Sequence, residues 1–151
     1  MKYGIVRNLK HEFVEFIPEE PEQGTLYISM RYKTGTHLCC CGCGNIVVTP
    51  ISPTDWKLTF NGRTVSLHPS IGNWSFPCQS HYWIRHNRVE WAQKWSRDQI
   101  ERARLHYDAT KEEYFTGAHV AFNASAKEDS GTINQVAPKR GFWRALKKWF
   151  S

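Results

Sequence analysis

Four of the five cysteines of this chain fall within positions 39–43, a spacing that indicates metal chemistry. They are Cys39, Cys40, Cys41 and Cys43, and the fifth, Cys78, begins the pattern Cys78-x-x-His81. Adjacent cysteines rarely meet the distance and dihedral requirements of a disulfide bond. Thiolates on a turn can instead converge on a tetrahedral zinc ion, and glycines at positions 42 and 44 would allow the backbone to curl around it. We therefore predict one zinc site.

The candidate ligands outnumber the four positions of a closed zinc site. Cys39, Cys41, Cys43, Cys78 and His81 all have suitable spacing, and Cys40 is a sixth candidate. One interpretation is a structural zinc that stabilises a small domain, with the spare residues packed nearby. The other gives a leftover side chain, His81 first, a chemical role. Cysteines at alternating positions of an extended strand would span about 13 Å, so the loop must turn sharply to bind one ion.

The composition predicts one compact cytoplasmic domain. The chain has 151 residues with 40% hydrophobic content, enough for a single core, and its seven Trp, six Tyr and eight Phe indicate an aromatic core or binding surface. It contains no run of 18 apolar residues, and its first residues lack the hydrophobic region of a signal peptide. We therefore expect a cytoplasmic protein with reduced thiols, which favours a metal site over disulfide bonds.

The positive charge is concentrated in the C-terminal tail. The net charge is +6, and from residue 117 onward six Lys and Arg residues stand against two acidic residues. The body of the protein is therefore nearly neutral. Because a nucleic-acid-binding domain needs a basic face, no nucleic-acid partner is expected.

Alternation of apolar and polar residues predicts an α+β fold with a small antiparallel sheet of hairpins, pinned at one end by the zinc. We expect residues 26–32 to form the strand that enters the metal loop and residues 45–49 the strand that leaves it. Asn61-Gly62 predicts a type I′ hairpin between residues 56–60 and 63–67. Residues 68–77, with two prolines and a glycine, predict a loop that delivers Cys78. Residues 81–85 and 88–91 predict a second hairpin.

A helix is expected to follow the strands. Ser96 and Gln99 have the spacing of a capping box, and the predicted helix continues to about Phe115 and packs on the sheet through Ile100, Ala103, Tyr107 and Tyr114. The expected domains are a zinc-binding domain at 1–116, a linker at 117–141 and a basic amphipathic segment at 142–151. That segment is expected to dock on its own domain or in a partner's groove. Membrane contact ranks lower, because about three basic residues attract anionic lipid weakly.

Five motifs together resemble a small bacterial family that is encoded beside ubiquitin-like proteins and their E1-like and E2-like enzymes. They begin at His11 (HxFVEFIP), Gly24 (GxLYIS), Cys39 (CxCGCG), Leu67 (LxPSIG) and Cys78 (CxSHYWI), and the resemblance covers about residues 11–92. It implies a zinc-binding protein in a bacterial ubiquitin-like pathway, with the ubiquitin-like protein and those enzymes as partners. It also suggests a peptidase that processes or deconjugates the ubiquitin-like protein. Cys40 departs from the family pattern and is therefore the first candidate for a bystander.

Hydrolysis needs a nucleophile, a base and donors for the oxyanion, and three routes fit these residues. In the preferred route, zinc is held by Cys39, Cys41, Cys43 and Cys78. His81 then activates Ser70, Gly72 keeps the loop backbone approachable, and Asn73 or a free N–H stabilises the oxyanion. In the second route His81 binds zinc and Cys39 is the nucleophile, and in the third a metal-bound water attacks. Ser80 competes with Ser70, and Asp55 is the nearest acidic candidate to orient His81.

Three other interpretations remain open. The first is a non-catalytic binding module, in which zinc shapes an aromatic surface for a ubiquitin-like protein or its conjugating enzymes. Its anchors would be Trp56, Trp74, Tyr82 and Trp83. The second, a zinc ribbon that binds nucleic acid, is disfavoured by the neutral body. The third is a redox sensor built from the clustered thiols.

Overall fold

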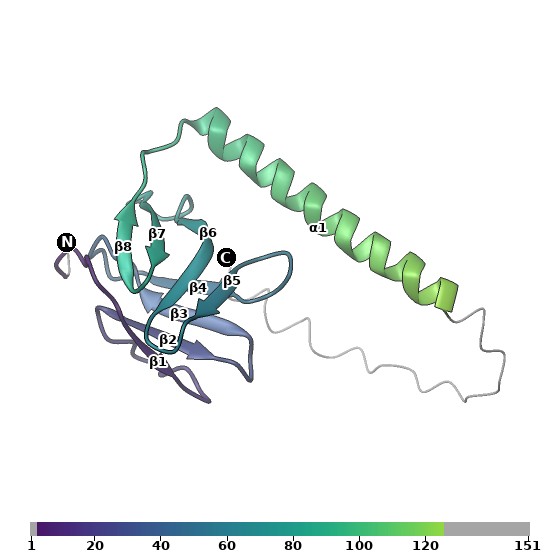
Figure 1. Ribbon diagram of the computed structural model, residues 1–151. Helices are drawn as coiled ribbons and strands as arrows, with labels where there is room; N and C mark the ends of the chain where they lie inside the picture. Colours follow the sequence, from purple (N-terminus) through teal and green to yellow (C-terminus); the bar gives the residue numbers. More distant parts are fainter. Residues whose placement is uncertain (1–2, 126–151) are drawn as a thin grey trace. The chain divides into compact units, whose positions relative to one another are not determined.

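The computed structural model describes residues 3–125, which form eight strands and one helix (Figure 1). The chain divides into two compact units, Met1–Tyr114 and Phe115–Ser151. All of the strands lie in the first unit, and so does every residue of the site described below. The strands are β1 (Lys10–Phe13), β2 (Thr25–Ser29), β3 (Thr34–Leu38), β4 (Ile46–Pro50), β5 (Lys57–Phe60), β6 (Val65–Gly72), β7 (His81–Arg85) and β8 (Arg88–Trp91), and the helix is α1 (Arg97–Ser125).

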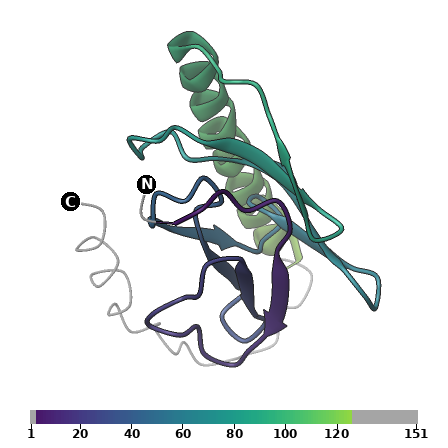
Figure 2. The ribbon, with the colours of Figure 1, turned by 90° about the vertical axis from the view of Figure 1, so that its left-hand side faces the viewer.

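The strands form two four-stranded sheets. The first has the order β1-β2-β3-β4 and the second β5-β6-β7-β8, so each sheet is built from consecutive strands. All neighbours are antiparallel except β1 and β2, which pair in parallel. Seen from the side, the two sheets form separate layers (Figure 2). The predicted α+β class is confirmed, with two sheets where the sequence analysis predicts one.

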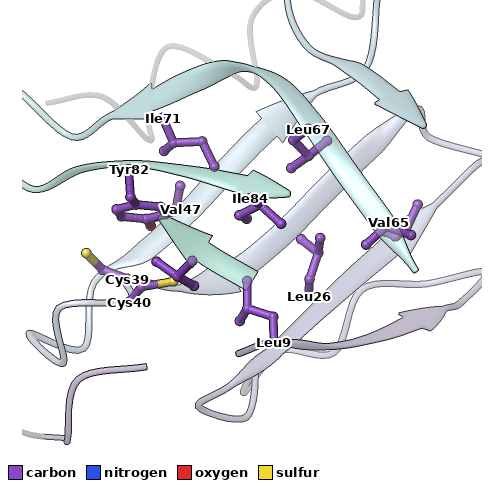
Figure 3. Close-up of a cluster of buried hydrophobic side chains, with 12 residues drawn as sticks. Leu9, Leu26, Cys39, Cys40, Val47, Val65, Leu67, Ile71, Tyr82 and Ile84 are labelled. Atoms are coloured by element: carbon purple, nitrogen blue, oxygen red, sulfur yellow. The ribbon is translucent and has the colours of Figure 1, made fainter. Parts of the chain in front are cut away.

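One apolar core lies between the sheets (Figure 3). Its fully buried members include Leu26 and Ile28 from β2, and Ile71, Tyr82 and Ile84 from β6 and β7. All five residues of β2 are buried, as expected for a central strand whose far face is also covered. The core therefore joins the two sheets through β2 on one side and β6 and β7 on the other.

The strand that enters the cysteine loop is β3, and the prediction that residues 26–32 do so is wrong. β2 ends at Ser29, and the chain reverses through a turn in which Lys33 has a φ of +49°. β3 then runs back beside β2 and leads directly to Cys39. The reversal has a weak sequence signal, because Lys33 adopts a left-handed conformation that usually calls for glycine or asparagine.

Both predicted hairpins are present, but the turn of the first differs from the prediction. Between β5 and β6 the loop has four residues, 61–64, and the Asn61 side-chain oxygen accepts hydrogen bonds from the backbone N–H groups of Arg63 and Thr64. Only Gly62 has a positive φ there, so the turn is not type I′. The paired positive φ values of a type I′ turn occur instead at His86 and Asn87, between β7 and β8.

Strand β6 continues through the first half of the region 68–77 predicted as a loop and ends at Gly72. Its pairing with β7 shifts between Leu67 and Ile71, so that residues 68–70 bulge out of the ladder opposite Trp83. Because proline lacks a backbone N–H, it would remove a hydrogen bond from a regular ladder. Within the bulge, Pro69 removes none. Bulges bend a strand and redirect side chains, and this one contains Ser70.

The capping box of α1 is confirmed. The Ser96 N–H donates to Gln99 Oε1 at 2.8 Å, and the Gln99 N–H donates to Ser96 Oγ at 3.3 Å. The helix continues to Ser125, past its predicted end near Phe115. Residues 97–114 of the helix do not bury a face on a sheet, because among them only Ile100, Ala103 and Lys111 are even half-buried.

The C-terminal predictions extend beyond the described part of the chain. The amphipathic segment 142–151 and most of the predicted linker lie outside residues 3–125. Within the described residues, no helix combines the length and apolar composition that a membrane-spanning segment needs.

Candidate active site and metal centre

Four cysteine sulfur atoms converge at one end of the two sheets. Cys39, Cys41, Cys43 and Cys78 each offer a sulfur, and all four atoms lie within 4.8 Å of one another. Neighbouring sulfurs are 3.4, 3.8 and 4.0 Å apart. In a tetrahedral zinc site with Zn–S bonds of about 2.3 Å, the sulfurs lie about 3.8 Å apart. The four cysteines therefore fit one tetrahedral metal ion.

The loop between β3 and β4 turns sharply enough to bring its three cysteines together. Gly42 and Gly44 both have a φ of +85°. A Cβ atom on Gly42 would lie 2.2 Å from the backbone oxygen of Tyr3, so the N-terminal segment approaches the loop too closely for a side chain there. The turn is closed by a hydrogen bond from the Gly42 N–H to the Cys39 carbonyl, at 3.0 Å.

The neighbouring side chains influence the thiols in different ways. Burial raises the pKa of Cys39 and of Cys41. Burial acts in the same direction on Cys43, but hydrogen bonds with Asn45, Cys41 and Cys78 outweigh it and lower its pKa to about 7. The Asn45 side chain donates to Cys43 Sγ at 3.2 Å. Without a metal, Cys39 and Cys41 would therefore resist ionisation, and a bound cation would have to deprotonate them.

Cys40 and His37 lie outside this cluster. Cys40 is buried in the apolar core, and burial raises its pKa to about 12 (Figure 3). His37 is fully buried with its Nε2 2.9 Å from the hydroxyl of Tyr82, and burial lowers its pKa to about 4. It is therefore neutral at pH 7 and has a structural hydrogen bond.

Ser70 and His81 form a hydrogen-bonded pair on the other side of β6 and β7. His81 Nε2 lies 2.9 Å from Ser70 Oγ, and His81 Nδ1 lies 3.2 Å from the backbone oxygen of Gln93. A carbonyl oxygen can only accept, so the proton of the neutral ring belongs on Nδ1. Nε2 is then unprotonated and accepts from the Ser70 hydroxyl. This is the arrangement of a base that removes a proton from a nucleophile.

Three elements place these groups. Ser70 lies in the bulge of β6, and His81 is the first residue of β7, paired with Gly72. Gln93 follows β8, and the N–H of Ala92 donates to the His81 carbonyl at 2.9 Å, which holds that segment beside the histidine. The side chain of His81 is surrounded by three rings, those of Trp74, Trp83 and Trp95, at centroid distances of 4.8–5.6 Å. His81 is 4% exposed, so the ring has little freedom to leave this position.

The other candidates lie elsewhere. Ser80 faces the cysteines, with its Oγ 3.0 Å from Cys39 Sγ. Asn73 donates to Ser80 Oγ at 2.9 Å and to Cys39 Sγ at 3.6 Å, so its amide is also engaged on the cysteine side. Asp55 accepts hydrogen bonds from Ser52 and from Tyr107, and it forms an ion pair with Lys111 at 2.8 Å.

Sequence reasoning could not find the group that orients His81. The sequence offers Asp55 only as the nearest acidic candidate, whereas the hydrogen-bond acceptor at Nδ1 is the backbone carbonyl of Gln93. Every residue has such a carbonyl, so nothing in the residue type marks position 93. Its only sequence signal is its place just after the predicted strand 88–91.

A cavity of about 350 Å³ lies beside the serine and histidine. Ser70, Gly72 and His81 line it together with a set of mainly apolar side chains. Its other lining residues are Thr54, Asp55, Trp56, Pro69, Trp74, Trp95, Ile100, Ala103, Arg104 and Tyr107. The cavity therefore gives a ligand direct access to the hydrogen-bonded pair.

Comparison with known families identifies one match. Residues 13–92, more than half of the chain, match the family model described as "Bacterial ubiquitination-like system serine protease (BubE)". The matched region contains the four clustered cysteines, Ser70 and His81, and ends just before Gln93. No curated protein and no solved structure matches the chain significantly.

Proposed function

We propose, since this chain belongs to the BubE family, that it is a serine-type peptidase with Ser70 as nucleophile and His81 as general base. One observation carries the proposal: His81 Nε2 lies 2.9 Å from Ser70 Oγ while Nδ1 is held by the Gln93 carbonyl. The family description refers to serine protease chemistry, and this pair supplies a nucleophile with its base.

The proposed reaction proceeds through an acyl-enzyme. Ser70 Oγ attacks the carbonyl carbon of the scissile bond while its proton moves to His81 Nε2. His81 then gives that proton to the leaving amine as the C–N bond breaks, and a water molecule hydrolyses the resulting ester with His81 again as base. The Gln93 carbonyl supports both steps, because it keeps the proton on Nδ1 and stabilises the positive ring that forms.

The oxyanion donors are proposed to come from the backbone of the β6 bulge. The β6–β7 ladder pairs no residue between Leu67 and Ile71, so the N–H of Ser70 lies outside this ladder. Gly72 keeps its proposed role as a substrate contact, since it lines the cavity. The Asn73 amide is engaged with Ser80 and Cys39, so we propose that it positions the cysteine cluster instead of donating to the oxyanion.

Zinc is proposed as the metal of the cysteine cluster. Four thiolates at tetrahedral spacing are the donor set of closed structural zinc sites. An ion held by Cys39, Cys41, Cys43 and Cys78 would have no open position, so it would stabilise the fold and take no part in the chemistry. This proposal keeps His81 free to act as a base.

The proposed substrate is a ubiquitin-like protein, as a precursor or a conjugate, and the proposed partners include its E1-like and E2-like enzymes. The support is the ubiquitination-like system named in the family description. A cytoplasmic location belongs to the same proposal, because the clustered thiols must stay reduced to bind the metal.

The test combines cleavage and metal content. Purified wild-type protein is incubated with a ubiquitin-like precursor, beside Ser70→Ala, His81→Ala and Ser66→Ala, and zinc is measured in each. Ser66 is the matched control because it is a serine of the same strand that does not line the cavity. We expect Ser70→Ala and His81→Ala to lose at least about 1,000-fold in cleavage rate, while all variants keep one zinc and Ser66→Ala keeps its activity.

Two outcomes would contradict the proposal. Loss of zinc in His81→Ala would make His81 a ligand. Absence of cleavage by the wild-type protein, with the ubiquitin-like protein still bound, would support the non-catalytic binding module instead.

A further inference from the structure

The walls of the cavity beside Ser70 are mostly aromatic or aliphatic. Trp56, Trp74, Trp95 and Tyr107 contribute rings, and Pro69, Ile100 and Ala103 add aliphatic surface. Trp74 and Trp95 stack on one another at a centroid distance of 5.4 Å and an interplanar angle of 19°. A volume of about 350 Å³ lies within the range of small-molecule binding sites, which begins at roughly 300 Å³. The cavity is therefore large enough to receive a bulky side chain.

The carboxylate on the cavity wall, that of Asp55, already has a positively charged partner. The Asp55 carboxylate accepts from Ser52 and Tyr107 and is paired with Lys111. These contacts hold the pKa of Asp55 below its ordinary value, although burial alone would raise it. The carboxylate thus offers little attraction for a basic substrate residue, and apolar contact dominates the cavity.

We infer that this cavity is the specificity site of the peptidase and binds a large apolar, preferentially aromatic, side chain of the substrate beside the scissile bond. The inference rests on the proposed function, because it assigns the substrate preference of the same site. Burial of such a side chain against aromatic walls contributes binding energy, and its position beside Ser70 presents the neighbouring carbonyl to the nucleophile.

Ala103 of α1 determines how much room remains. It is half-buried, it lines the cavity, and a larger residue there would fill the space. Ala109 lies on the same helix, is exposed and does not line the cavity, so it provides a matched control. Ala103→Trp should therefore block the cavity, and Ala109→Trp should leave it open.

The experiment measures protection of Ser70 from a fluorophosphonate probe. The Ser70 oxygen forms a bond to phosphorus, fluoride leaves, and the hydroxyl proton passes to His81. N-acetyl-phenylalaninamide is added as competitor, with N-acetyl-glycinamide as the control lacking a side chain. We expect the phenyl compound to slow labelling of the wild type and of Ala109→Trp by at least about fivefold at millimolar concentration. Neither compound should protect Ala103→Trp, whose fold is checked by circular dichroism and zinc content.

Equal protection by the two compounds, or full protection of Ala103→Trp by the phenyl compound, would overturn the inference. A second readout separates this failure from failure of the proposed function. Three tryptophans line the cavity, so its occupancy should change the intrinsic tryptophan fluorescence whether or not Ser70 reacts. No labelling of wild-type Ser70 would overturn the peptidase proposal, and with it the specificity role. A fluorescence change selective for the phenyl compound would then identify an aromatic binding site without catalysis.

Discussion

Neighbouring residues in the cysteine loop have opposite environments. Cys39 and Cys41 contribute sulfur atoms to the cluster, whereas Cys40 between them is buried in the core with Val47 and Tyr82 (Figure 3). The same alternation separates Ser80, which faces the cysteines, from His81, which faces Ser70. One residue of displacement along the chain therefore decides between a metal ligand, a core residue and a catalytic candidate.

The first prediction compares two adjacent cysteines. Cys40→Ala should leave the metal content unchanged and lower the free energy of unfolding by about 1–2 kcal/mol, because it removes a buried apolar group. Cys41→Ala should lose the metal. Zinc content by atomic emission and urea unfolding of both variants check this, and metal loss in Cys40→Ala would contradict the assignment of the cluster.

The candidate site depends on the register of β6 and β7 and on the half-buried loop that contains Asp55. The bulge in β6 brings the side chain of Ser70 within hydrogen-bonding distance of His81 of β7, and Gly72 leaves room for the ring of Trp74. The N-terminal half of α1 is held by Asp55, through Tyr107 and Lys111. These contacts are few, so single substitutions should affect the site without unfolding the sheets.

The second prediction concerns Gly72. A Cβ atom there would lie 2.4 Å from the indole of Trp74, so Gly72→Ala must displace that ring. We expect a loss of about 1–3 kcal/mol in stability and slower fluorophosphonate labelling of Ser70, because Trp74 packs against His81. Gly4→Ala is the control, since nothing lies within 4 Å of a Cβ there. Unchanged labelling in Gly72→Ala would show that the position of Trp74 does not matter for Ser70.

The third prediction concerns pH and Asp55. Hydrogen bonds and the Lys111 ion pair outweigh burial and lower the pKa of Asp55 from its ordinary value of 3.8. A carboxyl whose pKa is lower in the folded state stabilises that state fully above pH 3.8, and the contribution is lost as the pH falls through the lowered value. The free energy of unfolding of the wild type should thus exceed that of Asp55→Asn by about 1 kcal/mol at pH 7. This difference should shrink below pH 3.8. Urea unfolding at several pH values measures it, and a difference that grows in acid would refute the prediction.

The cysteine cluster connects the two sheets. Cys39, Cys41 and Cys43 follow β3 of the first sheet, and Cys78 precedes β7 of the second. A metal ion bound there cross-links segments that are otherwise joined by the apolar core. Ser80 and Asn73 link the cluster to the strands that bear His81 and Ser70. The metal should therefore support the active site from a distance without contacting it.

The fourth prediction concerns metal removal. Because the ion binds the folded state, its loss should lower the melting temperature by about 10 °C or more. Labelling of Ser70 should fall at the same time, although neither Ser70 nor His81 belongs to the cluster of four cysteines. Thermal unfolding and fluorophosphonate labelling check this, each measured before chelation, after chelation and after zinc is restored. Ser70→Ala is the control that keeps its metal. Full labelling of the metal-free protein would show that the cluster does not support the site.

Residue chemistry and local pattern determine much of this protein. The sequence by itself predicted both hairpins and the start of the helix, because each depends on a few neighbouring residues. It gave Cys39, Cys41, Cys43 and Cys78 as the preferred ligand set among several candidates, and the resemblance to a family marked Cys40 as the bystander. It also named Ser70 and His81, partly through the resemblance to a family. Their catalytic roles remain predictions, but the structure brings the two side chains together.

Only the tertiary structure decided which residues face one another. The bulge that exposes Ser70, the backbone carbonyl of Gln93 at His81 and the engagement of Asn73 with the cysteines all depend on strand register, which is set by the packing of two sheets around one core. The apolar cavity likewise needs side chains from the 54–56 loop, β6, β7 and α1. Such long-range contacts leave no local pattern in the sequence. A hydrogen bond to a distant backbone carbonyl, or a cavity wall shared by several segments, forms only once those segments meet.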